Sequence, residues 1–218
     1  MTDLQKAGGL AALLQALIYV LGFAAMATVL NPGAAQDWSA QQKLAFILER
    51  KAMFMGVNFV IYVLFGVLLT VLAVALHERW RERSPQWMKL ATPFGLIWAG
   101  LVIASGMIAN IGLQAVATLQ TKDPSQAVIV WRTIQVVADG IGGGNEIVGA
   151  LWVLLLSAAA WRSKALPAGL LYLGVFVGVC GLLSAIPPLK DSVILFGLSQ
   201  IVWFAWIGLH VLRQPSPQ

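Results

Sequence analysis

Six long apolar segments dominate this sequence of 218 residues. Each has about 20 residues or more, which is enough for an α-helix to cross a hydrocarbon core about 30 Å thick. The strands of a membrane β-barrel alternate polar and apolar residues, whereas these runs are continuously apolar. Hydrophobic residues make up 59% of the chain and charged residues 11%, too few for the surface of a soluble domain. The sequence therefore predicts an all-α, polytopic membrane protein.

The predicted spans belong to a single integral membrane domain that covers residues 1–218. They lie near 9–31, 52–76, 90–118, 128–161, 167–187 and 192–212. Between the first and second spans, the stretch "SAQQKLAFILERK" places Leu44, Ile47 and Leu48 on one helix face. This pattern predicts a short amphipathic helix at the membrane surface.

Basic residues in the loops predict the orientation of the chain. One side carries both chain ends and the basic residues Lys6, Arg79, Arg81, Arg83, Lys89, Arg162, Lys164 and Arg213. The other side carries Lys43, Arg50, Lys51, Lys122, Arg132 and Lys190. The densest cluster, at 79–89, favours both termini in the cytoplasm by the positive-inside rule. We therefore predict a multi-pass protein of the bacterial inner membrane, whose net charge of +5 contacts lipid headgroups and no nucleic acid.

The sequence contains few residues suited to metal or redox chemistry. The single cysteine, Cys180, excludes an intramolecular disulfide and a cysteine-based metal cluster. The histidines His77 and His210 stand at the ends of apolar runs, which favours an interfacial position over haem or metal ligation. No nucleotide-binding loop, zinc-protease pair or nucleophile elbow is present. We therefore predict no cofactor and no metal, and a non-enzymatic function is favoured.

The stretch "VADGIGGGNEIVGALWVLL", residues 137–155, places two carboxylates in a long apolar run. Arg132, Asp139 and Glu146 are spaced by seven residues, so in a continuous helix successive members drift by only about 20°. Gln135 falls on the same stripe of the helix. An intramembrane carboxylate normally faces the interior of a helix bundle and indicates a functional site.

Amide side chains from three other predicted spans share the depth of this stripe. With Trp161 at the cytoplasmic interface, Glu146 lies about 22 Å above it along the helix. The amides at similar heights are Asn58, Asn110, Gln114 and Gln200. Together with the stripe they predict a polar pocket that opens toward the periplasm or the outer leaflet.

The glycines of this stretch have a second interpretation, which the sequence leaves open. They would form a linker, Asn145 would cap a helix beginning near residue 145, and Glu146 would be favourable at its positive end. Residues 128–138 would then be a surface or re-entrant helix. The two interpretations overlap, because a broken helix that points its N-terminus into a cavity also builds a substrate site. Three deep tryptophans are open between core packing and ligand stacking: Trp98, Trp152 and Trp203.

Two stretches resemble a known family of membrane proteins. They are "GGGNEIVGALWVLLLSAAAWRSKALPAGLLYLGVFVGVCGLLSAIP" and "FGLSQIVWFAWIGLHVLR". They are similar to bacterial six-helix integral membrane proteins catalogued as domain of unknown function 4386. The most specific part is the Gly-Gly-Asn-Glu element that runs into "GALWVLLLS". The resemblance covers most of the chain and implies fold and location, but no activity.

Three classes of function fit these observations. The first is an inner-membrane protein that binds or transports a small or lipophilic ligand through the polar pocket. The second is a membrane enzyme that uses a buried carboxylate as acid or base on a lipid-borne substrate. The third is an accessory or structural subunit of a membrane complex, and homo- and hetero-oligomers both stay open. The predicted ligand-binding residues are Glu146, Asp139, Asn145, Arg132, Gln135, Asn58, Asn110, Gln114 and Gln200.

Overall fold

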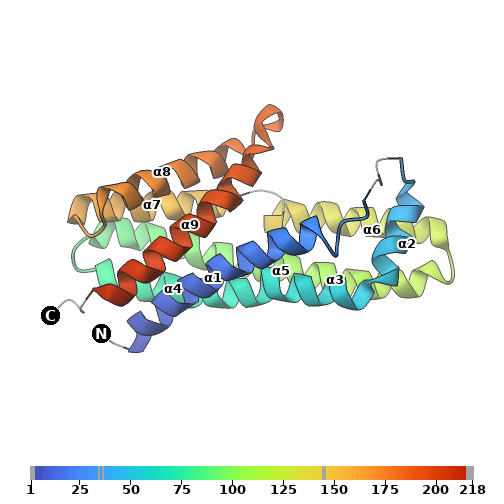
Figure 1. The fold of residues 1–218 in the computed structure, drawn as a ribbon, viewed down its shortest axis with the longest axis horizontal. Coiled ribbons are helices and arrows are strands. Elements are labelled where there is room, and N and C mark those ends of the chain that lie inside the picture. The colour runs from blue at the N-terminus through green and yellow to red at the C-terminus, as the bar shows by residue number, and fades with distance from the viewer. Residues whose placement is uncertain (1–2, 34, 36, 144–145, 215–218) are drawn as a thin grey trace.

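The computed structural model describes residues 3–33, 35, 37–143 and 146–214. Throughout these ranges the chain folds into helices, with no strand (Figure 1). The elements are α1 (Asp3–Ala27), α2 (Ala40–Glu49), α3 (Lys51–Asn58), η1 (Phe59–Leu64), α4 (Phe65–Trp80), α5 (Pro85–Gln120), α6 (Pro124–Ala138), η2 (Asp139–Gly143), α7 (Ile147–Ser163), α8 (Ala168–Leu183), η3 (Pro187–Leu189) and α9 (Ser192–Arg213). The all-α prediction is confirmed.

Five helical segments in the described part of the chain are long and apolar enough to cross a membrane. They are Asp3–Ala27, Lys51–Trp80, Pro85–Gln120, Pro124–Ser163 and Ser192–Arg213. The segment predicted as a span near 167–187 forms α8, which has 16 residues. At the usual rise per residue α8 is about 24 Å long, shorter than the hydrocarbon core. Length and composition therefore support five spanning segments and do not support the sixth.

The core lies where α1, α4, α5, α7, α8 and α9 pack together. At its centre, five aromatic rings form a closed cycle in which successive ring centroids are 5.3–5.8 Å apart. The rings belong to Phe65, Trp98, Trp152, Trp203 and Phe204. Edge-to-face aromatic pairs add to the free energy of packing beyond the apolar area they bury. Trp152 and Trp203 therefore pack in the core, which is one of the two roles that the sequence left open for them.

The predicted amphipathic helix between the first two spans is α2. It begins with a capping box, in which the Gln42 N–H donates to Ser39 Oγ at 3.2 Å and the Ser39 N–H donates to Gln42 Oε1 at 2.8 Å. Leu44 is buried in a small cluster with Val116 of α5 and Ala127 of α6. Leu44 and the neighbouring Leu48 thus pack on protein, and a position of α2 at a membrane surface stays a prediction.

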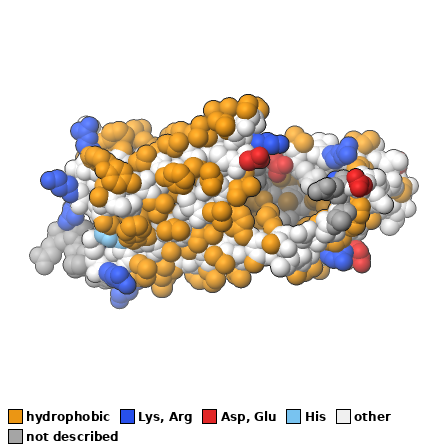
Figure 2. Space-filling view, turned by 45° about the horizontal axis from the view of Figure 1, so that its top comes forward, with side chains coloured by type: hydrophobic (Ala, Val, Ile, Leu, Met, Phe, Trp, Pro, Cys, Tyr) orange, Lys and Arg blue, Asp and Glu red, His pale blue; other side chains and the backbone are white. Residues whose placement is uncertain are grey.

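Both chain ends lie at the same end of the molecule, where α1 begins and α9 ends (Figure 1). Lys and Arg side chains gather around this end in the space-filling view (Figure 2). The arrangement places the chain ends together, as the predicted topology requires. Which side of a membrane this end faces stays a prediction.

Candidate functional site

The helix predicted over 128–161 is interrupted. α6 ends at Ala138, the short η2 follows, and α7 begins only at Ile147. Within η2, Gly142 has φ 148° and ψ 5°, a conformation that residues with a Cβ atom rarely adopt. The helix is therefore broken at the glycines. Of the two interpretations of this stretch, the broken helix is the one that the structure has.

A buried serine of α5 fastens the end of α6 beside this break. Ser105 Oγ donates a hydrogen bond of 2.9 Å to the carbonyl oxygen of Ala138. A buried carbonyl group without a partner is costly, so this bond stabilises the position at which α6 ends. Sequence reasoning missed Ser105, although a single serine in the apolar run of 101–105 was a signal for it.

Glu146 occupies the position immediately before α7. Its carbonyl oxygen accepts the first hydrogen bond of the helix, from the Ala150 N–H at 2.8 Å, and its side chain makes no capping hydrogen bond. The carboxylate therefore lies at the positive end of the α7 dipole and is stabilised by it. Asn145, which the sequence predicted as the cap and as a ligand-binding residue, lies outside the described residues.

A cavity of about 310 Å³ lies beside Glu146. It is formed between the second half of α1, η1 with the start of α4, the middle of α5, the break before α7, and the start of α9. The space-filling view shows a hollow on this face of the molecule, bordered by hydrophobic side chains and with acidic side chains at its edge (Figure 2). The lining is mostly apolar, whereas the sequence predicted a polar pocket. Its aromatic members are Tyr19, Phe23, Tyr62, Phe65, Trp98 and Phe196.

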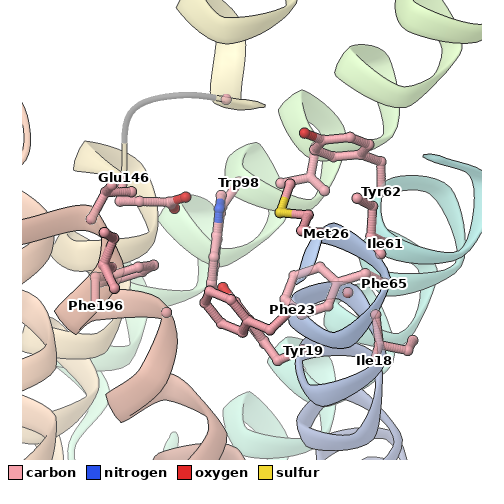
Figure 3. Close-up of a pocket in the computed structure, with 16 residues that line it drawn as sticks. Ile18, Tyr19, Phe23, Met26, Ile61, Tyr62, Phe65, Trp98, Glu146 and Phe196 are labelled. Carbon is pink, nitrogen blue, oxygen red and sulfur yellow. The ribbon is translucent and has the colours of Figure 1, made fainter. Parts of the chain in front are cut away.

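Glu146 is the one charged side chain among the described residues that line the cavity. Figure 3 shows it reaching in from one side and Tyr62 from the other. The carboxylate interacts electrostatically with the phenol groups of Tyr19 and Tyr62. Its side chain has no hydrogen bond or ion pair to another residue of the described ranges. The carboxylate is therefore available to a ligand in the cavity.

Two of the predicted amides serve to join helices. Asn58 Nδ2 donates to Asn110 Oδ1 at 3.2 Å, and Asn110 Nδ2 donates to the carbonyl oxygen of Met55 at 3.1 Å. These bonds connect the end of α3 to α5 next to the wider turn of η1. Neither side chain lines the cavity. Gln200 is fully buried but also lies outside the cavity lining.

The remaining predicted residues lie on the exposed surface. Arg132, Gln135 and Asp139 are exposed along α6 and at its end, and Gln114 is exposed on α5. The predicted stripe therefore does not lead into the cavity. The physical reason is the break at Gly142, because the register between residues 139 and 146 exists only in a continuous helix. Asp139 retains an electrostatic interaction with Tyr62.

The aromatic wall of the cavity was missed by sequence reasoning. Tyr19, Tyr62 and Phe65 come from segments that composition identifies only as spans. All three tyrosines of the chain lie inside predicted spans, and two of them line the cavity; their place in the spans was the available signal. Trp98 belongs both to the core cycle of rings and to the cavity lining, so it packs in the core, and stacking on a ligand stays a prediction.

The side chains at this site that could supply an oxygen ligand to a metal are one carboxylate and two phenols. Over the described ranges, no three His, Cys, Asp or Glu side chains gather where they could hold a metal ion. No family model, curated protein or solved structure matches this chain. The resemblance to domain of unknown function 4386 therefore stays a prediction, and function must be argued from the site itself.

Proposed function

We propose that this chain is an integral membrane protein that binds or transports a small lipophilic ligand in the cavity beside Glu146. The observation that carries the proposal is an apolar cavity, walled by aromatic rings, into which one carboxyl group projects that has no hydrogen bond or ion pair to the described residues. Ligand sites typically combine a concave apolar lining with a few polar groups that orient the ligand. A volume of about 310 Å³ suits a small molecule.

The proposed topology has six spans, with α8 as the short one. α8 packs along α7 and α9, both of which belong to segments long enough to cross a membrane. The proposed location is the bacterial inner membrane, with both termini in the cytoplasm, and the concentration of basic residues near the chain ends supports this orientation. The cavity, at the opposite ends of α1 and α9, would then lie in the periplasmic half.

The rim of the cavity indicates where the ligand enters. Met26 of α1 and Ile194 of α9 line the cavity and are 57% and 53% exposed. Large apolar side chains at an opening are favourable against acyl chains and unfavourable against water. The ligand would therefore enter sideways from the lipid, which fits a lipophilic molecule.

Native mass spectrometry of the protein extracted from its membrane tests this proposal. The wild-type protein is expected to retain a lipophilic molecule of defined mass. Ile194→Trp fills the rim and is expected to reduce that occupancy at least severalfold. Leu195→Trp is the matched control, since Leu195 is exposed on the same helix but does not line the cavity. Equal occupancy in both variants would contradict the proposal.

A further inference from the structure

We infer that the ligand of this cavity is an organic cation, an ammonium group attached to an apolar body. The inference rests on the proposed function and adds the charge and shape of the molecule. It depends on three observations: the charge at the cavity, the rings around it, and the absence of a competing basic side chain in the described lining.

Glu146 is the one acid among the described residues that line the cavity, and none of them is a lysine or arginine. The N-terminus of α7 is by itself a site for an anion. The Glu146 carboxyl group already occupies that position, and in its ionised form it would repel a second anion in a medium of low dielectric constant. A cationic group would instead favour the ionised form of Glu146 and gain a counter-charge that no described residue of the protein neutralises.

The rings around Glu146 form a continuous aromatic wall. The ring centroids are 5.4 Å apart between Tyr19 and Phe65, and 5.8 Å apart between Phe65 and Trp98. Phe196 continues the wall at 6.3 Å from Trp98. The faces of aromatic rings attract cations, most strongly where water is excluded, and such walls recognise quaternary ammonium groups. Figure 3 shows Phe196 and Trp98 next to Glu146, Tyr19 near Trp98, and Phe65 farther across the cavity.

The apolar part of the ligand has its own place. Ile18 and Ile61 line the cavity on the side away from the carboxylate, and Met26 lies between them and Glu146 (Figure 3). The exposed rim residues described above connect this part to the surroundings. A molecule with a compact cationic head and a short apolar body would contact both the carboxyl group and the apolar side chains of the cavity. An inorganic cation would interact only with the carboxyl group.

Equilibrium dialysis tests the inference with two probes of the same shape. Protein in phosphatidylglycerol nanodiscs is dialysed against empty nanodiscs of the same lipid, which corrects for partition into the bilayer. The probes are benzyltrimethylammonium and its uncharged carbon isostere, neopentylbenzene. Because a desolvated cation–π contact alone is worth about 2 kcal/mol, the cation is expected to bind roughly tenfold more tightly or better.

A charge variant identifies the source of this preference. In Glu146→Gln the rings remain and the counter-charge is lost, so the preference for the cation over neopentylbenzene is expected to fall at least threefold. Glu82→Gln is the control, since Glu82 is an exposed acid in the turn after α4 and does not line the cavity. Equal binding of both probes to the wild-type protein would overturn the inference and leave the proposed function standing. Absence of binding for both would overturn both.

Two sources could supply such an ammonium group, a free amphipathic amine or the headgroup of phosphatidylethanolamine. Adding phosphatidylethanolamine to the nanodiscs separates them. If the lipid competes with benzyltrimethylammonium, the natural ligand is the lipid headgroup. If it does not compete, the ligand is a free organic cation. Displacement of the probe by benzylsulfonate at equal concentration, which the negative cavity should repel, would contradict the inference.

Discussion

The indole of Trp98 lies directly against Gly149, so that a Cβ atom at position 149 would come within 2.6 Å of Trp98 Cε2. The opposite contact is similar, because a Cβ atom on Gly95 would come within 2.5 Å of Trp152 Nε1. Each of the helices α5 and α7 thus supplies one tryptophan and the glycine that accommodates the other. This exchange brings the two indole centroids to 5.7 Å and fixes Trp98 as a wall of the cavity.

Gly149→Ala is expected to displace Trp98. Overpacking of a close-packed core typically costs about 1–3 kcal/mol, and the cationic probe should also bind more weakly. Thermal unfolding in detergent and the dialysis assay measure the two effects. Gly100→Ala is the control, because its added methyl group meets no atom within 4 Å and alanine favours a helix. Loss of stability in both variants alike would show that the contact with Trp98 is not the cause.

Gly142→Ala is expected to destabilise the break between α6 and α7. The left-handed conformation at φ 148° strains a residue with a Cβ atom, at a cost on the order of 1–3 kcal/mol. Gly140→Ala, two residues earlier, adds a methyl group that meets no atom within 4 Å. Thermal unfolding of the two variants compares them. A Gly142→Ala protein as stable as Gly140→Ala would contradict the described backbone.

Asn58 and Asn110 are expected to be energetically coupled. A double-mutant cycle with Asn58→Ala and Asn110→Ala should give an interaction free energy of about 0.6–1.7 kcal/mol, as for other hydrogen bonds between membrane helices. Chemical unfolding in mixed micelles measures it. Gln114→Ala serves as the control, since its exposed side chain lies outside this pair. Additive effects of the two substitutions would mean that the bond at 3.2 Å contributes nothing.

Gln200→Met is expected to stabilise the protein. The side chain is 0% exposed, and neither its Oε1 nor its Nε2 has a hydrogen-bond partner within the described structure. Replacing a buried, unsatisfied amide by an apolar chain of similar length removes a desolvation cost of about 1–3 kcal/mol. Gln15→Met on α1 should behave in the same way, because Gln15 has the same two unpartnered atoms. A lower unfolding temperature in both variants would instead indicate buried water bound to the amides.

The sequence predicted the helices well, because their start and stop signals are local. Long apolar runs located the spans, whereas α5 and α6 begin at Pro85 and Pro124, ahead of the predicted starts near 90 and 128. The break before α7 depends on the φ angle of Gly142. The run of glycines in the sequence is compatible with both a continuous and a broken helix, so the sequence could not decide between them. The cavity depends on Tyr19, Tyr62 and Phe196, which meet only through tertiary packing. The sequence therefore singled out Glu146, which lines the cavity, but not its aromatic neighbours.

The helices of this protein differ greatly in length. α5 has 36 residues and is about 54 Å long, whereas α7, with 17 residues, is about 26 Å long. The bundle is consequently stepped: near the chain ends many helices lie side by side, and α2, α3, α6 and the end of α5 extend beyond the starts of α7 and α9 (Figure 1). The cavity lies where the shorter helices begin, so the longer helices extend past its opening. The exposed rim residues of α1 and α9 mark a side from which a partner could reach a bound molecule.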